Sequence, residues 1–228
     1  MKPEFDSALE TNSAEDNLKR LIDWFVGFES CIVAFSAGVD SSLLALAAKK
    51  ALQNRAYAVT SHSPSFPRSE KITAELIAKE IGIKLIVVDQ DDLGNSWYVK
   101  NEVTRCYFCR NNLASAIYPI AQRLSVKLCV DGTHLDDMRT PRPGIRALRE
   151  AGFRAPLAEL EMGKDAVRAM ARYSGLSNWD RPSEACLSSR IAFGQEIDEK
   201  TLRRIESAEI IVRSITGART VRVRTIGR

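Results

Sequence analysis

Residues 31–42, Cys-Ile-Val-Ala-Phe-Ser-Ala-Gly-Val-Asp-Ser-Ser, run from an apolar stretch through small residues into a helical pattern. Residues 31–35 are apolar enough for a buried parallel strand, and the leucines and alanines from 43 to 47 continue with helical spacing. Small side chains between the two leave backbone N–H groups at a helix N-terminus open to a phosphate. The segment therefore predicts a phosphate-binding loop. The candidate ligands are Ser36, Ala37, Gly38, Val39, Asp40, Ser41 and Ser42.

Asp40 is the one carboxylate of this loop. A carboxylate beside a polyphosphate is repelled unless a divalent cation lies between them. The loop therefore predicts bound Mg²⁺, with Asp40 as a metal ligand and catalytic residue.

The remaining pattern predicts an α/β fold with a doubly wound parallel sheet. We expect strands at 56–60, 84–89 and 127–131, and helices beginning at Ser13 and covering 68–81, 113–124 and 198–215. Ligands bind at the carboxyl ends of such strands. This edge adds the nucleotide-binding candidates Ser61, His62, Gly132 and Thr133.

Composition is consistent with a cytoplasmic enzyme. The chain has 228 residues, of which 45% are hydrophobic, so it can bury a sizeable core. We expect no membrane segment, because no run approaches the ~18 apolar residues that a spanning helix needs, and no export signal is apparent. Five cysteines, an odd number, argue against a disulfide framework and predict thiols or metal ligands.

Three cysteines form a candidate metal site. Cys106 and Cys109 have C-x-x-C spacing between two arginines, which favours thiolates, and Cys186 is the third. Three thiols suit an iron–sulfur cluster with one open iron, or a zinc ion with a fourth ligand from elsewhere. The other two, Cys31 and Cys129, alternate with apolar residues in expected strands and are predicted to be buried.

The loop of residues 36–42 resembles the S-G-G-x-D-S motif of PP-loop ATP pyrophosphatases, with Ala37 in place of the second residue. Alanine fits there only if its φ is negative or the strain is tolerated. Four further segments, 131–137, 142–144, 154–157 and 181–190, resemble the LarE-type ATP-dependent sulfurtransferases within that superfamily. The similarity runs from about residue 18 to 224.

This resemblance implies a reaction. ATP adenylates a carboxylate of a small carboxylated nucleotide, pyrophosphate is released, and sulfur displaces AMP to give a thiocarboxylate of a nickel-pincer nucleotide. Cys186 matches the residue that gives up its sulfur in single-cysteine members. The additional pair of Cys106 and Cys109 resembles members in which three cysteines hold a [4Fe-4S] cluster.

The resemblance also implies residue roles. Arg142 and Arg190 bind substrate, and Arg222 and Arg224 hold its phosphate. Apart from the resemblance, the adjacent acids Asp136 and Asp137 after a strand could hold Mg²⁺ against the phosphates, with Asp137 as the candidate beside Asp40, although such acids are also common helix starters. We expect an ATP-binding domain at 1–190 and a shortened, basic α+β segment at 191–228, with a strand at 220–224, in a homo-oligomer. The sulfur source is not indicated.

Two other functions stay open. Seven arginines follow residue 200 and could track an RNA backbone, as in PP-loop enzymes that thiolate tRNA. Alternatively, the chain could be a non-catalytic nucleotide- or metal-sensing module that keeps the fold.

Overall fold

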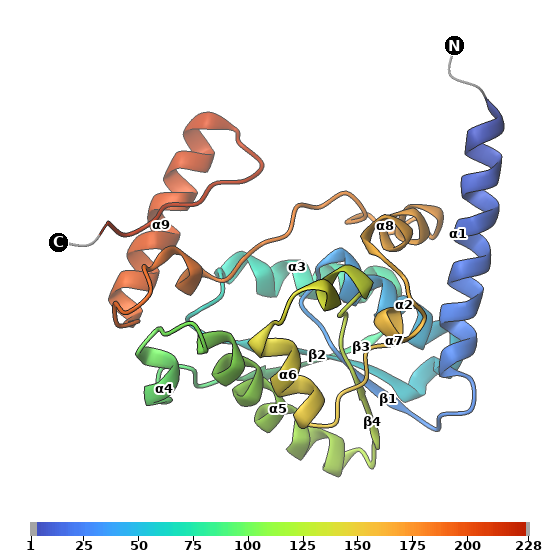
Figure 1. Cartoon of the computed structure of the whole chain (residues 1–228), viewed down its shortest axis with the longest axis horizontal. Coiled ribbons are helices and arrows are strands. Elements are labelled where there is room, and N and C mark those ends of the chain that lie inside the picture. Colours follow the sequence, from blue (N-terminus) through green and yellow to red (C-terminus); the bar gives the residue numbers. More distant parts are fainter. Residues whose placement is uncertain (1–3, 227–228) are drawn as a thin grey trace.

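The computed structural model describes residues 4–226, with side chains from residue 13 onward. Four parallel strands form one sheet in the order β3-β2-β1-β4 (Figure 1). Their bounds are Cys31–Ala34 for β1, Ala56–His62 for β2, Lys84–Asp89 for β3 and Leu128–Val130 for β4. Cys31 stands opposite Ala56 on β2 and Leu128 on β4. At the outer edge of β4, Val130 bridges to Arg154, which covers part of that edge.

Helices cover both faces of the sheet, as the doubly wound prediction requires. They are α1 (Glu4–Phe25), α2 (Val39–Leu52), α3 (Arg68–Ile81), α4 (Ser96–Val99), α5 (Arg105–Arg123), α6 (Pro143–Glu150), α7 (Pro156–Glu159), α8 (Lys164–Tyr173) and α9 (Glu199–Thr216). Short 3-10 helices are η1 (Gln53–Arg55), η2 (Leu135–Arg139) and η3 (Leu187–Arg190). None of the helices within 4–226 is long and apolar enough to span a bilayer.

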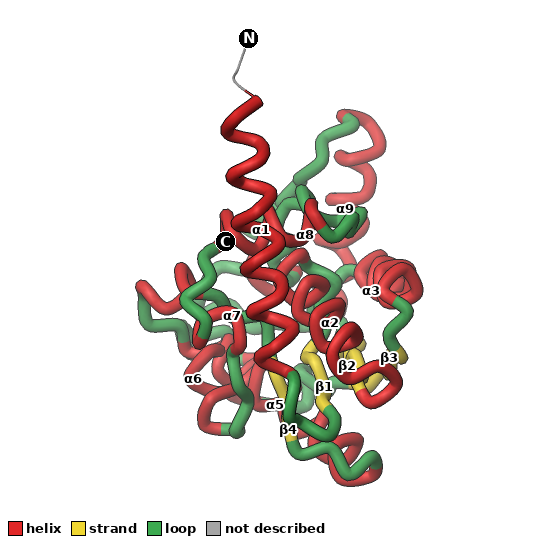
Figure 2. Tube along the Cα trace, turned by 90° about the vertical axis from the view of Figure 1, so that its right-hand side faces the viewer, coloured by secondary structure: helices red, strands yellow, loops and turns green. Residues whose placement is uncertain are grey.

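Side chains along each strand point alternately to the two faces of the sheet, so the interior is divided into two layers. Cys31 and Val33 pack with α1, α2, α3 and α8 in the larger core. Ile32 points the other way and packs with Cys129 and side chains of α5 and α6. In Figure 2, α1 runs along the outside of α2 and α8, above the strands. The prediction that Cys31 and Cys129 are buried is confirmed.

A third, smaller core lies at the other end of the molecule. It joins α9 to α4 and η3 through Tyr98, Leu187, Ile191, Ile197, Leu202 and Ile205. In Figure 1, α9 lies well away from α1, beyond α4 and α3. This core draws on residues from both sides of position 190, so the C-terminal segment packs on the rest of the chain without a clean boundary there.

Three expected elements differ in the structure. The first helix begins at Glu4, not at Ser13. The helix expected at 113–124 begins at Arg105, so the C-x-x-C pair lies in its first turns, and it continues through Pro119. The strand expected at 220–224 is absent from the described chain: Val223 N–H donates to Glu209 Oε1 at 3.0 Å rather than to a neighbouring strand.

Candidate functional site

The phosphate-loop candidate joins β1 to α2. Gly38 is the N-cap of α2, and no side chain within the described chain caps it. The first intrahelical bond is from Ser42 N–H to Gly38 C=O, 3.0 Å. The N–H groups before it have no intrahelical acceptor. Asp40 is the one acidic residue in this first turn.

Two serines give the loop its shape. Ser41 Oγ donates to Gly38 C=O at 3.1 Å and accepts from Ser36 N–H at 3.2 Å. Ser36 Oγ lies 3.2 Å from Ser41 Oγ, and it accepts a hydrogen bond from Gly38 N–H at 3.4 Å. These hydroxyl contacts fold the backbone tightly around residues 36–41, as a phosphate-binding turn requires.

Ala37 carries the strain that the sequence suggested. Its φ is +55°, in the left-handed region, and its side chain is fully buried. A non-glycine residue there costs about 1–2 kcal/mol. The side-chain amide of Asn178 braces this turn by donating to Ala37 C=O and to Ser42 Oγ, each at 2.9 Å.

Gly132 allows the loop after β4 to pack against the start of α2. A Cβ at this position would stand 3.0 Å from Ser41 N and 3.1 Å from Asp40 Cβ. Both are tighter than ordinary contacts, so glycine is needed for this approach. Gly132 therefore lies directly beside the phosphate-loop candidate.

Asp40 lies in a cluster of opposite charges. Both of its carboxylate oxygens accept from Lys164 Nζ, at 2.7 Å each. His134 Nε2 lies 4.0 Å from Asp40 Oδ1 and 3.4 Å from Asp137 Oδ2. Asp137 in turn pairs with Arg142 at 2.8 Å. The structure thus brings together Asp40, Asp137 and Arg142 from three separate segments.

His134 occupies the middle of this cluster. Its backbone N–H donates to Asp137 Oδ2 at 3.2 Å, so the two residues form a reciprocal cap at the start of η2. The side chain is buried, and its Nδ1 has no hydrogen-bond partner among the described residues. Asp136 Oδ2 lies 3.8 Å from this nitrogen, so Nδ1 faces Asp136, whereas Nε2 faces Asp40 and Asp137.

The remaining nucleotide candidates flank the loop at neighbouring strand ends. Ser61 and His62 are the last residues of β2, whereas the sequence placed them in a loop. His62 Nδ1 lies 3.6 Å from Asp89 at the end of β3. Thr133 N–H and hydroxyl both donate to Asp131, the former at 2.8 Å. Burial raises the pKa of Asp131, partly offset by these bonds.

The three cysteines gather around the start of α5, away from the sheet core. Cys106 is exposed, and Cys109 and Cys186 are half-buried as residues. Among residues 4–226, no group of three histidine, cysteine or acidic side chains is arranged to hold a metal ion. A charge on Cys186 nevertheless raises the pKa of Cys109, and one on Cys106 raises that of Cys186, so the thiols are electrostatic neighbours.

The prediction that flanking arginines favour thiolates is wrong for Cys109. Burial, with Asp92 next, raises the pKa of this thiol to about 12, and Arg110 offsets only part of the rise. Burial also raises the pKa of Cys186, against a lowering by Arg105. Desolvation of a charged sulfur outweighs a nearby cation here.

A chain of buried hydroxyls holds the Cys186 segment. Tyr98 Oη lies 2.6 Å from Ser65 Oγ and 2.6 Å from Ser188 Oγ. Leu187 N–H donates to Ser65 C=O at 2.8 Å. The residue after Cys186 is therefore fixed to the loop that follows β2, which ties the third cysteine to the nucleotide side of the fold.

The arginines expected to bind substrate have different environments. Arg142 is exposed beside Asp137. Arg190 is 1% exposed, and its Nε donates to buried Glu209 at 2.8 Å. Its position makes it a structural residue of the small core rather than a surface ligand. Arg222 and Arg224 are exposed in the extended segment after α9.

Sequence reasoning missed Lys164 and Asn178. Lys164 is the first residue of α8, where a positive charge opposes the helix dipole. That unfavourable placement is a signal of function that could have been used. Asn178 carries no comparable signal, because its role depends on contacts with residues more than a hundred positions away.

A small-residue loop at a helix N-terminus, at the carboxyl edge of a parallel sheet, is the arrangement of a PP-loop nucleotide-binding domain of the NAD synthase type. A protein-family profile described as NAD synthase matches residues 11–124. Within that class the chain belongs to the LarE family. This confirms the resemblance and the fold class.

Similarity to curated proteins, one of which has a named activity, supports the assignment to the LarE family. Pyridinium-3,5-bisthiocarboxylic acid mononucleotide synthase of Lactiplantibacillus plantarum is 32% identical over 84% of this chain and 70% of its own length. The uncharacterized protein slr1717 of Synechocystis sp. is 40% identical over 92% of this chain and 78% of its own. The uncharacterized protein MJ0830 of Methanocaldococcus jannaschii is 29% identical over 84% and 73%. These similarities support an ATP-utilising enzyme.

Proposed function

We propose that this protein is an ATP-dependent sulfurtransferase that adenylates a substrate carboxylate and replaces one of its oxygens with sulfur. The observation that carries the proposal is the uncapped N-terminus of α2 beside the Asp40–Lys164 pair. The relative named as a bisthiocarboxylic acid mononucleotide synthase supports a carboxylated nucleotide as substrate and a place in nickel-pincer nucleotide synthesis.

In the first step, an oxygen of the substrate carboxylate attacks the α phosphorus of ATP, and pyrophosphate leaves with the bonding electron pair. The β and γ phosphates bind the N–H groups at residues 36–42, where the helix dipole favours negative charge. Lys164 Nζ, now 2.7 Å from both oxygens of Asp40, supplies a cation for the leaving pyrophosphate.

The oxygen donors of the cluster suit Mg²⁺. Asp40 and Asp137 would hold the ion; both carboxylates lie on the Nε2 side of His134, at 4.0 and 3.4 Å from that nitrogen. When bound, Mg²⁺ neutralises charge on the departing pyrophosphate. Lys164 competes for Asp40 and so must shift toward the phosphates when nucleotide and metal bind.

In the second step, sulfur attacks the acyl carbon and AMP leaves with the former carboxylate oxygen. Cys186 is the proposed sulfur nucleophile. Burial raises the pKa of its thiol, so it must lose a proton in the loaded site, and Arg105 already lowers the cost of the thiolate. If Cys186 gives up its own sulfur, the thioester that it forms with the substrate loses the Cα proton of Cys186 to a base and the Cβ–Sγ bond breaks, so the thiocarboxylate leaves, dehydroalanine remains at position 186, and each chain turns over once.

The thiols of Cys106, Cys109 and Cys186 are the ligand type of a [4Fe-4S] cluster and are electrostatic neighbours, so they would hold it only after moving from their described positions, which are not arranged around a metal ion. Such a cluster would supply a transferable sulfide and allow several turnovers. Zinc on the same thiols would instead be structural. Iron, acid-labile sulfide and zinc content of anaerobically purified protein distinguishes these alternatives.

The basic C-terminal segment supports binding of the substrate phosphate better than binding of tRNA. Several of its arginines pair within the chain: Arg203 with Glu206 at 3.0 Å, and Arg219 with Asp180 at 3.1 Å. Arg222 and Arg224 are exposed and are the proposed phosphate ligands. Ile211 and Ile215, also exposed on α9, support self-association, which sedimentation velocity measures.

The proposal is tested by pyrophosphate release with pyridinium-3,5-biscarboxylic acid mononucleotide as substrate. Asp40→Ala is expected to abolish release. Cys106→Ala is expected to leave release unchanged and to stop only sulfur transfer. Loss of release in both well-folded variants would contradict this division of roles. No release from the parent protein with this substrate would leave the tRNA-thiolation and nucleotide-sensing alternatives, which release in the presence of tRNA would separate.

A further inference from the structure

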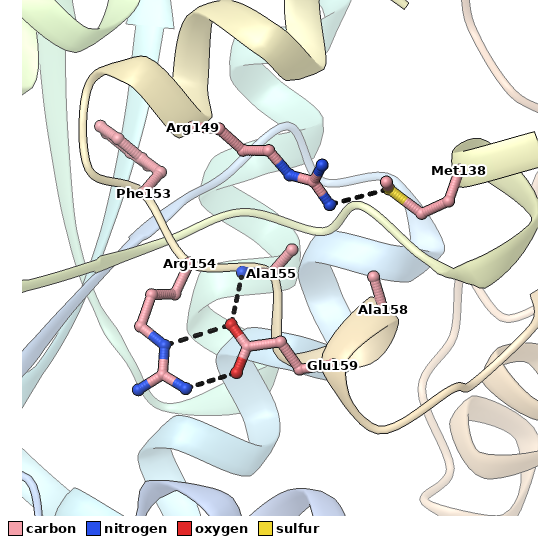
Figure 3. A pocket seen from close by; sticks show the side chains of 7 residues that line it. All are labelled: Met138, Arg149, Phe153, Arg154, Ala155, Ala158 and Glu159. Atoms are coloured by element: carbon pink, nitrogen blue, oxygen red, sulfur yellow. Dashed lines mark hydrogen bonds and ion pairs between the residues drawn. The ribbon is translucent and has the colours of Figure 1, made fainter. Parts of the chain in front are cut away.

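A cavity of about 310 Å³ lies at the outer edge of β4, between η2, α6 and α7. It is lined by Met138, Arg149, Phe153, Arg154, Ala155, Ala158 and Glu159 (Figure 3). Its size falls at the lower end of small-molecule pockets, which measure roughly 300–1,000 Å³. None of its lining residues belongs to the phosphate loop or to the three cysteines.

Arg149 forms no salt bridge within the described part of the chain, although its charge lowers the pKa of buried Asp131. Within residues 4–226, the hydrogen bond of its side chain is from Nη2 to Met138 Sδ, 3.2 Å. A thioether is a weak acceptor and carries no charge. Figure 3 shows the guanidinium extending from α6 across the cavity toward Met138. Most of its donors therefore remain available to a ligand.

The other arginine of the cavity is different, because it is already paired. Arg154 donates from Nε to Glu159 Oε1 at 3.1 Å, and its second donor bonds Glu159 Oε2. Its guanidinium also lies 4.5 Å from the centre of the Trp24 ring. Arg154 and Glu159 satisfy each other's charges at one side of the cavity. Arg149 is therefore the residue whose charge can attract an anionic ligand.

The rest of the lining is apolar. Ala155 and Ala158 present methyl groups to the cavity, whereas the Phe153 ring is buried in the core beside α5 and points away from Arg149. One bidentate cation beside an apolar wall matches an organic anion with a compact apolar or aromatic body.

We propose that this cavity is a binding site for a small organic anion, whose carboxylate or phosphate pairs with Arg149 and whose apolar body packs on Ala155 and Ala158. The anion takes the place of Met138 Sδ as partner of the guanidinium. Met138 therefore moves or changes its surroundings when the site fills, which provides a local reporter.

The test uses protein labelled with ¹³C at the methionine methyl groups. The Met138 signal is identified with Met138→Leu and followed by NMR during titration with benzoate, with benzamide as its uncharged counterpart, and with inorganic phosphate. Benzoate is expected to shift the Met138 signal saturably and benzamide is not. Met162 and Met170, which are buried in the main core, should not move.

Arg149→Gln is expected to weaken benzoate binding at least about tenfold, because the charge-assisted pair is lost. Arg146→Gln is the matched control: it lies on the same helix but pairs with Glu150 at 3.5 Å, outside the cavity. Ala158→Phe should block the site with Arg149 intact. Tighter binding of phosphate than benzoate would identify a phosphate-bearing ligand, and the reverse a carboxylate with an apolar body.

Three results would overturn the proposal. The first is a Met138 signal that moves with neither anion, the second is an equal response to benzamide and benzoate, and the third is unchanged benzoate affinity in Arg149→Gln.

Discussion

Asn178 is expected to couple the stability of the fold to the binding of ATP. Its amide donates two hydrogen bonds of 2.9 Å, to Ala37 C=O and to Ser42 Oγ, and the residue is buried. Two neutral hydrogen bonds contribute about 1–3 kcal/mol together. Asn178→Ala should therefore lower the free energy of unfolding by about that amount. In a chain of this length the melting temperature should fall by about 2–12 °C.

The same substitution should weaken ATP binding, because Ala37 is held at a φ of +55° that an unbraced alanine avoids. Urea unfolding followed by circular dichroism, with and without ATP and Mg²⁺, measures both effects. A tenfold loss of affinity removes about 1.4 kcal/mol from the stabilisation by saturating ATP. Ser177→Ala is the control, since its hydroxyl bonds Glu80 on the surface.

The reasoning fails if Asn178→Ala is no less stable than Ser177→Ala. It also fails if ATP stabilises both variants equally, since the brace would then have no connection with the phosphate loop.

Three further predictions concern charge and burial. Lys164→Met should reduce pyrophosphate release at least tenfold, with Lys164→Arg recovering part of it in a coupled phosphate assay; unchanged release would remove the lysine from the reaction. Iodoacetamide at pH 8 should label exposed Cys106 well before Cys109, whose pKa is raised to about 12. Mass spectrometry should show that the rate of Cys109 labelling rises about tenfold per pH unit below that value. Equal labelling rates of Cys106 and Cys109 would contradict the burial of the Cys109 thiol. Arg190→Ala should destabilise the protein by about 3–5 kcal/mol in urea, because it leaves buried Glu209 without its partner; a loss under 1 kcal/mol would restore Arg190 as a candidate substrate ligand.

Local sequence patterns predicted most of the fold. Apolar stretches bounded by small or polar residues located all four strands, and β3 and α3 have the expected bounds. The strand at 220–224 failed because alternation alone does not provide a neighbouring strand. The start of the helix that holds the C-x-x-C pair was missed because its first two turns mix cysteine and aromatic residues with arginine and asparagine and show no clear apolar face.

The candidate site was only partly predictable. Small residues and one acid defined the loop of residues 36–42 without any knowledge of tertiary structure. Lys164, by contrast, reaches Asp40 from 124 positions along the chain. Arg190 looked like a surface ligand because its partner, Glu209, meets it only after α9 packs on η3. Charge next to a cysteine predicted thiolates, but burial decides the pKa of Cys109.

The formation of an acyl-adenylate is tested most directly by isotope transfer. Substrate labelled with ¹⁸O in its carboxylates is incubated with ATP, Mg²⁺ and the protein, and AMP is analysed by mass spectrometry. The account predicts one ¹⁸O in the phosphate of each AMP formed with thiocarboxylate product, because the carboxylate oxygen that attacks phosphorus leaves with AMP. Unlabelled AMP, or ADP in place of AMP and pyrophosphate, would contradict it.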